Sequence, residues 1–328
     1  MGFDYRPLIP FKLFTPATAR AIEEGGQART DKTVRMEYDG EHNLPKDVPV
    51  QGRGALHFKR TLSAFTLEGR TAVVTGGARG LGLVMAQALV ISGANLAIVD
   101  LDQAEAEKQA AEIEKTWKAE NPGAENCPKI TAHYCDVSSQ KSVETCFQEV
   151  LGAHNGTIDN LVTSAGFTDN INAIDYPIER VRKLFSVDFD GTWMWSVALA
   201  KHLMERKAPG SIVHIASMSG DIVNVPQPQA AYNAAKAAVK HLASSFAVEW
   251  AGDGIRVNSI SPGYMLTPLT KKILEENPDI KRQWTSLIPQ GRMGAPEDLM
   301  GAVVYLLSDA SMYVTGAELR VDGGYTVT

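Results

Sequence analysis

Short runs of apolar and β-branched residues alternate with longer amphipathic stretches from residue 67 onward. Each short run, such as TAVVT at 71–75 or NLAIVD at 95–100, is apolar at nearly every position, which is typical of strands buried on both faces of a sheet. The expected strands are 71–75, 95–100, 130–135, 158–163, 211–217, 255–261 and 318–321. The expected helices are 80–92, 103–120, 139–151, 177–206, 230–251 and one that follows Pro296.

Strands that alternate with helices predict right-handed crossovers and a parallel sheet covered on both faces. We therefore expect residues 67–328 to form a single doubly wound α/β domain of the Rossmann type, with a seven-stranded parallel sheet. Residues 264–295 carry few regular signals, and we expect a mobile substrate flap there. Residues 1–66 hold five prolines and many charges without a sustained period, so they predict an irregular N-terminal extension; a mitochondrial leader and a disordered tail are the alternatives.

The charge and cysteine content narrow the environment and the partners. A net charge of −6 disfavours nucleic acid and anionic membranes as partners, since both reward clustered Lys and Arg. The sequence contains no run of 18 apolar residues, so it predicts no membrane span. The three cysteines, Cys127, Cys135 and Cys146, have no metal-site or disulfide spacing. We expect a cytoplasmic protein without a metal site, with a mitochondrial location as the lesser alternative.

A glycine-rich segment, TGGARGLG at 75–82, lies between the first strand and the first helix. Glycines at this place allow a tight turn, a close approach of a pyrophosphate and close helix–strand packing. Free N–H groups at the helix start then bind the phosphate charge. The segment predicts a dinucleotide-binding loop that consists of Gly76, Arg79, Gly80, Leu81 and Gly82.

Asp100 ends the second strand, 18 residues after Gly82, where a carboxylate accepts hydrogen bonds from the adenosine ribose. A helix N-cap is the alternative role for Asp100. The carboxylate would repel a 2′-phosphate, whereas Arg79 could pair with one, and Leu101 adds no second base. On balance we expect NAD(H), with NADP(H) as the alternative cofactor.

Tyr232 and Lys236 stand at i and i+4 on one face of a predicted helix. A phenol is a weak base near neutral pH, but a neighbouring ammonium and an oxidised nicotinamide would favour its ionised form. Ser217 ends a strand at the carboxyl edge of the sheet, where its hydroxyl can donate to a substrate carbonyl; Ser219 is the fallback. The plainer alternatives are a surface lysine over a tyrosine ring and a serine that caps a strand end.

Thr75–Gly82, Ser217 and the Tyr232/Lys236 pair, in this order, resemble the short-chain dehydrogenase/reductase family over residues 67–328. The resemblance implies that Tyr232 is the general acid/base, that Lys236 favours the phenolate and holds the nicotinamide ribose, and that Ser217 positions the substrate. It also implies a homotetramer built through the helices at 177–206 and 230–251. Further cofactor contacts implied by it are Asp136, Val137, Ser164, Ala165, Gly166, Pro262, Gly263, Met265 and Thr267.

Two positions depart from the family pattern. Thr163–Gly166 reads TSAG, where the family usually has Asn-Asn-Ala-Gly. Asp188 stands where the family usually has a catalytic Asn that stabilises a helix kink and a water chain to the lysine. Our hypothesis is that Asp188 keeps the kink, attracts Lys236 and supports catalysis; the alternative is that its charge disturbs the proton relay.

The stretch before Tyr232, VNVPQPQAAY at 223–232, resembles the fungal polyol dehydrogenases and ketose reductases, which include D-arabinitol 2-dehydrogenase, L-xylulose reductase and mannitol 2-dehydrogenase types. Amide side chains there can pair with several sugar hydroxyls, although they could instead satisfy loop backbone. We expect an NAD(P)(H)-dependent oxidoreductase that interconverts a polyol and its 2-ketose. The alternatives are a reductase of a bulkier apolar carbonyl and a catalytically silent dinucleotide-binding protein. The predicted substrate contacts are Ser217, Asn224, Gln227, Gln229 and Tyr264.

Overall fold

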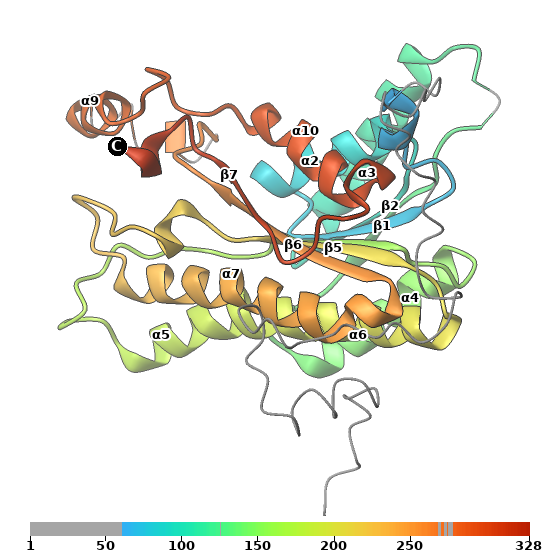
Figure 1. The fold of residues 1–328 in the computed structure, drawn as a ribbon, viewed down its shortest axis with the longest axis horizontal. Helices are drawn as coiled ribbons and strands as arrows, with labels where there is room; N and C mark the ends of the chain where they lie inside the picture. The colour runs from blue at the N-terminus through green and yellow to red at the C-terminus, as the bar shows by residue number, and fades with distance from the viewer. Residues whose placement is uncertain (1–60, 125, 268–269, 272–273, 275–277) are drawn as a thin grey trace, which may run out of the picture. The chain divides into compact units, whose positions relative to one another are not determined.

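The computed structural model describes residues 61–124, 126–267, 270–271, 274 and 278–328 (Figure 1). Its parallel sheet has the strand order β3-β2-β1-β4-β5-β6-β7. The predicted seven-stranded, doubly wound fold is therefore confirmed, and the order reverses between β1 and β4, where such sheets bind ligands. The strands are β1 (Thr71–Thr75), β2 (Asn95–Asp100), β3 (Ile130–Tyr134), β4 (Asn160–Thr163), β5 (Gly210–Ile215), β6 (Ile255–Pro262) and β7 (Glu318–Val321). All but the last six residues of the predicted N-terminal extension lie outside the described residues.

Helices cover both faces of the sheet (Figure 1). One layer consists of α2 (Gly80–Ile91), α3 (Gln103–Glu120) and α10 (Met300–Leu307). The other layer consists of α4 (Gln140–Ala153), α5 (Ile178–Phe185), α6 (Gly191–Arg206) and α7 (Ala230–Trp250). The segments outside these layers are α9 (Pro278–Ser286), the π-helical η2 (Ser186–Asp190) and the 3₁₀ turns η1 (Thr61–Phe65), η3 (Met218–Gly220), η4 (Ala251–Asp253), η5 (Pro296–Leu299), η6 (Asp309–Ser311) and η7 (Tyr325–Val327).

Alternate residues of each central strand enter the two layers. In β1, Val74 packs in the core with α2 and α10, whereas Val73 packs in the core with α4 and α6. In β2, Ile98 and Val99 divide in the same way. Each such fully buried aliphatic side chain contributes roughly 1.5–3 kcal/mol to the free energy of unfolding. This two-sided burial explains why the strands read as unbroken apolar runs.

The helix starts differ in a way that bears on function. Asp102 caps α3 by accepting the Glu105 N–H at 3.1 Å, and Ser139 caps α4. At the start of α2, by contrast, the Arg79 side chain makes no capping hydrogen bond. The first N–H groups of α2 are thus left for another acceptor.

Three predictions of local structure need correction. The predicted helix 177–206 is interrupted by the π-helical η2, because the chain there turns Asp188 inward. The predicted strand 211–217 ends at Ile215, two residues before Ser217. The predicted flap is more regular than expected: it contains α9, and Trp284 belongs to a small buried cluster with Leu274, Ile288 and Met293. These apolar residues are too widely and irregularly spaced for the sequence pattern to predict that they share a core.

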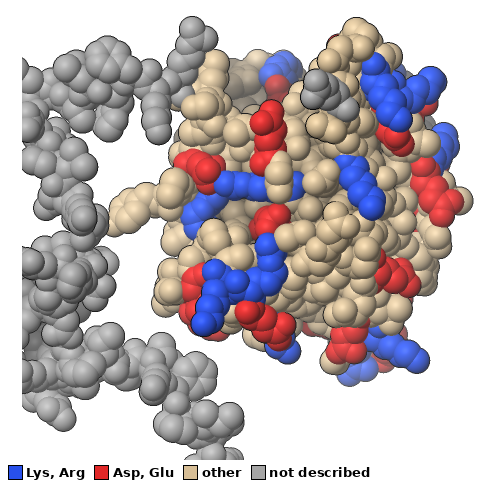
Figure 2. Space-filling view, turned by 90° about the vertical axis from the view of Figure 1, so that its right-hand side faces the viewer, with Lys and Arg blue, Asp and Glu red and all other residues tan. Residues whose placement is uncertain are grey.

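Charged residues are interspersed over the surface. Figure 2 shows acidic and basic side chains side by side on the described part of the face it presents, with no broad patch of one sign. Many of these charges form short-range pairs, such as Lys115 with Glu112 on α3. In the described part of the chain, no helix combines the length and the apolar character that a membrane crossing requires.

Candidate active site

Gly76 and Gly82 of the glycine-rich loop leave no room for a side chain. Gly76 and Gly80 have φ of +65° and +55°, a conformation that favours glycine. A Cβ on Gly82 would lie 2.1 Å from the Gly76 carbonyl oxygen, and a Cβ on Gly76 would lie 2.7 Å from the Ala165 Cα. The loop therefore lies close to the uncapped start of α2. This shape fits a dinucleotide pyrophosphate, whose charge the free N–H groups can bind.

The segment after β4 packs against the start of the glycine-rich loop. The backbone N–H groups of Ser164 and Ala165 both reach the Thr75 hydroxyl oxygen, at 3.2 and 3.3 Å. These contacts tie the predicted cofactor residues Ser164 and Ala165 to the carboxyl end of β1. We call Thr75–Gly82 together with Ser164–Gly166 the cofactor cradle.

Asp100 ends β2 beside this loop. Its Oδ2 accepts the Ala78 N–H at 3.0 Å, and its Oδ1 accepts the Asp102 N–H at 3.1 Å. The cap of α3 is Asp102, so the alternative role of Asp100 as a helix cap is wrong. Arg79 does not point to a vacant site, because its exposed guanidinium pairs with Asp102. In the structure Asp100 is therefore held by backbone N–H groups and Arg79 by Asp102.

Asp136 and Val137, the predicted adenine contacts, follow β3. Hydrogen bonds from the Ser138 side chain and backbone, with Lys183 nearby, hold the pKa of Asp136 below its usual range. Val137 packs against Gly191, where a Cβ would lie 2.9 Å from its side chain. Both residues are therefore fixed at the carboxyl end of β3.

A buried ion pair lies between α7 and η2. Lys236 is 6% exposed and Asp188 is fully buried, and the Lys236 Nζ lies 3.1 Å from the Asp188 Oδ2. The same ammonium donates to the Ile215 carbonyl oxygen at 3.1 Å. Asp188 also accepts the Phe167 N–H at 3.0 Å, which anchors the segment after β4. The structure thus brings Asp188 to Lys236, as the hypothesis on this residue expected.

Two opposing effects set the charge of Lys236. Burial, the largest single effect, lowers the pKa of Lys236; Asp188 and Tyr232 oppose it, and the net pKa is raised above its usual value. Gly166 allows this contact, since a Cβ there would lie 2.9 Å from the Asp188 Oδ2. The lysine therefore remains an ammonium near neutral pH.

The Tyr232 ring lies next to this ammonium, and Ser217 comes two residues after its partner Ile215. The Lys236 Nζ is 5.5 Å from the centroid of the Tyr232 ring. The alternative of a surface lysine over a tyrosine ring is wrong, because this lysine is buried. Ser217 follows Ile215, the residue whose carbonyl binds Lys236. Its Oγ accepts the Ser219 N–H at 3.1 Å and donates to the Ser219 Oγ at 3.0 Å, so Ser217 also caps η3.

The segment after β6 lines the same edge of the sheet. Gly263 has no room for a Cβ beside Asp322, and its N–H donates to the Val321 carbonyl. Pro262 pairs with Val321 in the sheet. Met265 bridges to Gly294, and Thr267 is hydrogen-bonded to Thr270. The predicted nicotinamide contacts Pro262, Gly263, Met265 and Thr267 are therefore held on one short segment.

Polar and aromatic side chains converge beside it. Tyr264 accepts an N–H from the amides of both Asn224 and Gln227, each at 3.4 Å. Its ring stacks on Trp284 at 4.1 Å between centroids, with 7° between the planes. The Trp284 Nε1–H donates to the Gln227 Oε1 at 3.3 Å. We call Asn224, Gln227, Tyr264 and Trp284 the substrate wall.

Gln229, the remaining predicted substrate contact, lies elsewhere. Its amide donates to the side chains of Thr168 and Asn170, at 3.0 and 2.9 Å. Those contacts connect the loop before α7 to the segment after β4, so the structure separates Gln229 from the other two amides. Trp284 was not singled out from the sequence, because nothing near position 284 indicates a partner 57 residues earlier.

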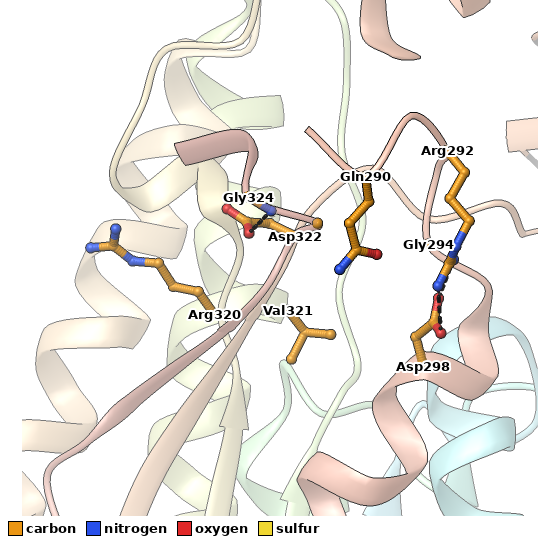
Figure 3. Close-up of a pocket in the computed structure, with 9 residues that line it drawn as sticks. Gln290, Arg292, Gly294, Asp298, Arg320, Val321, Asp322 and Gly324 are labelled. Carbon is orange, nitrogen blue, oxygen red and sulfur yellow. Dashed lines mark hydrogen bonds and ion pairs between the residues drawn. The ribbon is translucent and has the colours of Figure 1, made fainter. Parts of the chain in front are cut away.

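A cavity of about 370 Å³ lies between residues 290–298 and the end of β7 (Figure 3). Arg292 faces Asp298 in a two-pronged ion pair, and Asp322 turns back to the Gly324 N–H. Its lining includes neither Tyr232 nor Lys236. Elsewhere in the described residues, no group of three or more His, Cys, Asp or Glu side chains is placed to hold a metal ion.

Comparison with known proteins agrees with this geometry. The family profile described as "Enoyl-(Acyl carrier protein) reductase" matches residues 76–326. A crystal structure of a short-chain type dehydrogenase/reductase from Mycobacterium marinum superposes with a TM-score of 0.74 at 35% sequence identity, covering 82% of this chain and all of that one. The chain belongs to the short-chain dehydrogenase/reductase family.

Among curated members of the short-chain dehydrogenase/reductase family, the chain is similar to several sugar-alcohol enzymes. D-arabinitol 2-dehydrogenase of Candida tropicalis is 38% identical, covering 82% of this chain and 96% of that protein. NADH-dependent L-xylulose reductase of Ambrosiozyma monospora is 40% identical, covering 81% and 98%. NADP-dependent mannitol dehydrogenase of Hypocrea jecorina is 39% identical, covering 86% and 99%. The predicted resemblance to this branch is confirmed.

Proposed function

We propose that this short-chain dehydrogenase/reductase interconverts a sugar alcohol and its 2-ketose with NAD(P)(H). The observation that carries the proposal is the buried ammonium of Lys236 beside the Tyr232 ring, at the sheet edge that also bears Ser217. The similar proteins act on arabinitol, xylulose and mannitol according to their names, which supports this substrate class. A catalytically silent protein would have no need of this buried charge next to a phenol.

Each residue has a distinct task in the proposed reaction. The bound dinucleotide supplies or takes up the hydride. Tyr232 donates its phenolic proton to the carbonyl oxygen in reduction and takes the proton back in oxidation. The Lys236 ammonium favours the phenolate, and the Ser217 hydroxyl turns from Ser219 to donate to the substrate oxygen. Gly76 and Gly82 admit the pyrophosphate to the start of α2.

The substrate wall favours a polyol over a bulky apolar carbonyl. Asn224 and Gln227 turn their amides toward the Tyr264 hydroxyl rather than away from the sheet edge. An apolar pocket would use the Trp193 side chain. Its ring instead packs on that of Phe246 on α7, with 5.0 Å between the ring centroids. Amide and phenol groups that lose a hydroxyl partner incur the full desolvation cost of a buried polar group.

We propose NAD(H) as the preferred cofactor. The carboxylate of Asp100 stands at the end of β2, and Arg79, which could oppose it, is already neutralised by Asp102. A 2′-phosphate there would meet the carboxylate of Asp100, and the Arg79 guanidinium would have to leave Asp102 to pair with it. The similar proteins include both an NADH-dependent and an NADP-dependent enzyme, so their names do not decide the matter.

We further propose a cytoplasmic homotetramer assembled through α6 and α7. Trp193 on α6 is 46% exposed and Val248 on α7 is 83% exposed, which leaves apolar surface for a second copy. Cys127, Cys135 and Cys146 are free thiols, as a reducing compartment would keep them. Light scattering after size-exclusion chromatography would give four times the chain mass; a monomer would contradict the assembly.

The function is tested by following the absorbance of the reduced cofactor at 340 nm. The panel consists of D-ribulose, L-xylulose and D-fructose, each with NADH and NADPH, together with an acyl ketone and a steroid ketone. We expect turnover of at least one ketose, faster with NADH. Turnover of the apolar ketones alone would overturn the substrate class, and cofactor binding without any turnover would overturn the enzymatic function.

A further inference from the structure

The substrate wall contains one polar atom whose partner is missing. Asn224 is only 4% exposed, and its Oδ1 has no hydrogen-bond partner among the described residues, although its amide nitrogen donates to Tyr264. A buried carbonyl oxygen without a donor costs about 1–3 kcal/mol. An atom in this state at the edge of a proposed substrate site is available to accept a hydrogen bond from a bound ligand.

The Tyr264 hydroxyl complements it. Its oxygen already accepts N–H groups from Asn224 and from Gln227. Because its lone pairs are engaged, its remaining hydrogen-bonding capacity is as a donor, which a ligand would share with the neighbouring Tyr325 side chain. Asn224 and Tyr264 therefore present one acceptor and one donor side by side. A hydroxyl group, which donates one hydrogen and accepts another, matches this pair.

Trp284 decides the orientation of the Gln227 amide. An amide can turn by 180° with little change of shape, which would exchange its donor and its acceptor. The Trp284 Nε1–H can only donate, and it donates to the Gln227 Oε1, so the Gln227 amide nitrogen must face Tyr264. Trp284 is 6% exposed and its ring is stacked flat on Tyr264, which fixes the plane of both rings.

We propose that Trp284 is a positioning residue that orients Gln227 and Tyr264, so that Tyr264 and Asn224 together bind a substrate hydroxyl beyond the reacting carbonyl. This inference rests on the proposed function and extends it. It states that the donor and acceptor directions at Gln227, Tyr264 and Asn224 select substrates that carry hydroxyl groups. The loops that follow β5 and β6 carry the pair, and in Figure 1 the start of α7, the C-terminus and α9 lie at the same end of the sheet.

The test compares substrates that have the same carbon skeleton with and without hydroxyls. D-ribulose is paired with 2-pentanone, and D-fructose with 2-hexanone, each reduced with NADH. Trp284→Phe keeps an aromatic ring on Tyr264 but removes the N–H. We expect kcat/KM for the ketose to fall about 10-fold, mostly through KM, while kcat/KM for the matching ketone stays within twofold.

A second variant works without touching the tryptophan. Gln227→Glu keeps the size of the side chain, but its carboxylate would draw the Tyr264 hydrogen to itself, so we expect the same loss of discrimination. Trp117→Phe on α3 is the matched control, since it is the same substitution on a helix that contributes no residue to the substrate wall. Equal melting temperatures establish that the variants are folded.

Different results would overturn the proposed function and the proposed role of Trp284. If the wild type reduces none of the ketoses, the proposed function is wrong. If the wild type discriminates between ketose and ketone, and Trp284→Phe and Gln227→Glu discriminate equally well, the proposed role of Trp284 is wrong and the function stands. An equal fall for ketose and ketone would also overturn it, because that result indicates a structural role only.

Discussion

The cofactor cradle and the substrate wall lie at the same edge of the sheet, yet different contacts hold them. The cradle is built from backbone: Gly76 and Gly82 admit no side chain, and Thr75 binds the N–H groups of the neighbouring segment. The substrate wall is built from side chains, in which Tyr264 and Trp284 support the amides of Asn224 and Gln227. The pyrophosphate of a widely used cofactor can be bound by backbone N–H groups, whereas a particular substrate requires chosen side chains.

The largest effect should come from filling the cradle. Gly82→Ala places a Cβ 2.1 Å from the Gly76 carbonyl, and such overpacking costs about 3 kcal/mol at the upper end, so NADH affinity should fall about 100-fold. Fluorescence titration of NADH measures this loss. Gly152→Ala on α4, where a Cβ meets nothing within 4 Å, is the control. Equal affinities for the two variants would show that the cradle does not bind the pyrophosphate.

A smaller effect should follow a change of charge beside the cradle. Asp100→Ala combined with Leu101→Arg removes the acceptor for the ribose hydroxyls and adds a partner for a 2′-phosphate. The ratio of kcat/KM for NADH to that for NADPH should fall roughly 30-fold, since about 2 kcal/mol is involved. Steady-state kinetics with both cofactors measure the ratio. An unchanged ratio would contradict the proposed preference for NAD(H).

These two regions also differ in how far sequence predicts them. The strands, the glycine loop, Asp100 and the Tyr232/Lys236 pair follow from short-range spacing on regular elements, whereas the strand order is known only from the structure. The position of Gln229 could not be predicted, because its partners Thr168 and Asn170 lie about sixty residues away along the chain. Trp284 was missed for the same reason: the fold alone brings it to Tyr264.

Asp188 joins the catalytic edge to the cradle, and its charge should produce the smallest effect. Asp188 and Tyr232 raise the pKa of Lys236 against burial, so Asp188→Asn lowers that pKa and favours loss of the lysine proton. A lysine that has lost its charge no longer favours the phenolate, so the rising limb of polyol oxidation should move toward alkaline pH, with kcat changed less than tenfold.

The pH profile of kcat measures this shift. Asp190→Asn is the matched control, because it removes the same charge from an exposed side chain on η2. A gain of more than tenfold in turnover for Asp188→Asn would show that the native carboxylate hinders the proton relay. Identical profiles for the two variants would show that Asp188 does not act through Lys236.

Centrally, we propose that the Tyr232 hydroxyl transfers the proton and that the Lys236 ammonium favours ionisation of that hydroxyl. The substitution Tyr232→Phe tests this most directly. The substitution keeps the ring beside the Lys236 ammonium and removes one oxygen atom. The decisive measurement is single-turnover reduction of the best ketose at saturating NADH, with NADH affinity determined on the same sample. We expect the rate to fall by about 10³-fold or more, with NADH affinity within a few fold of wild type. A rate within tenfold of wild type would contradict the account.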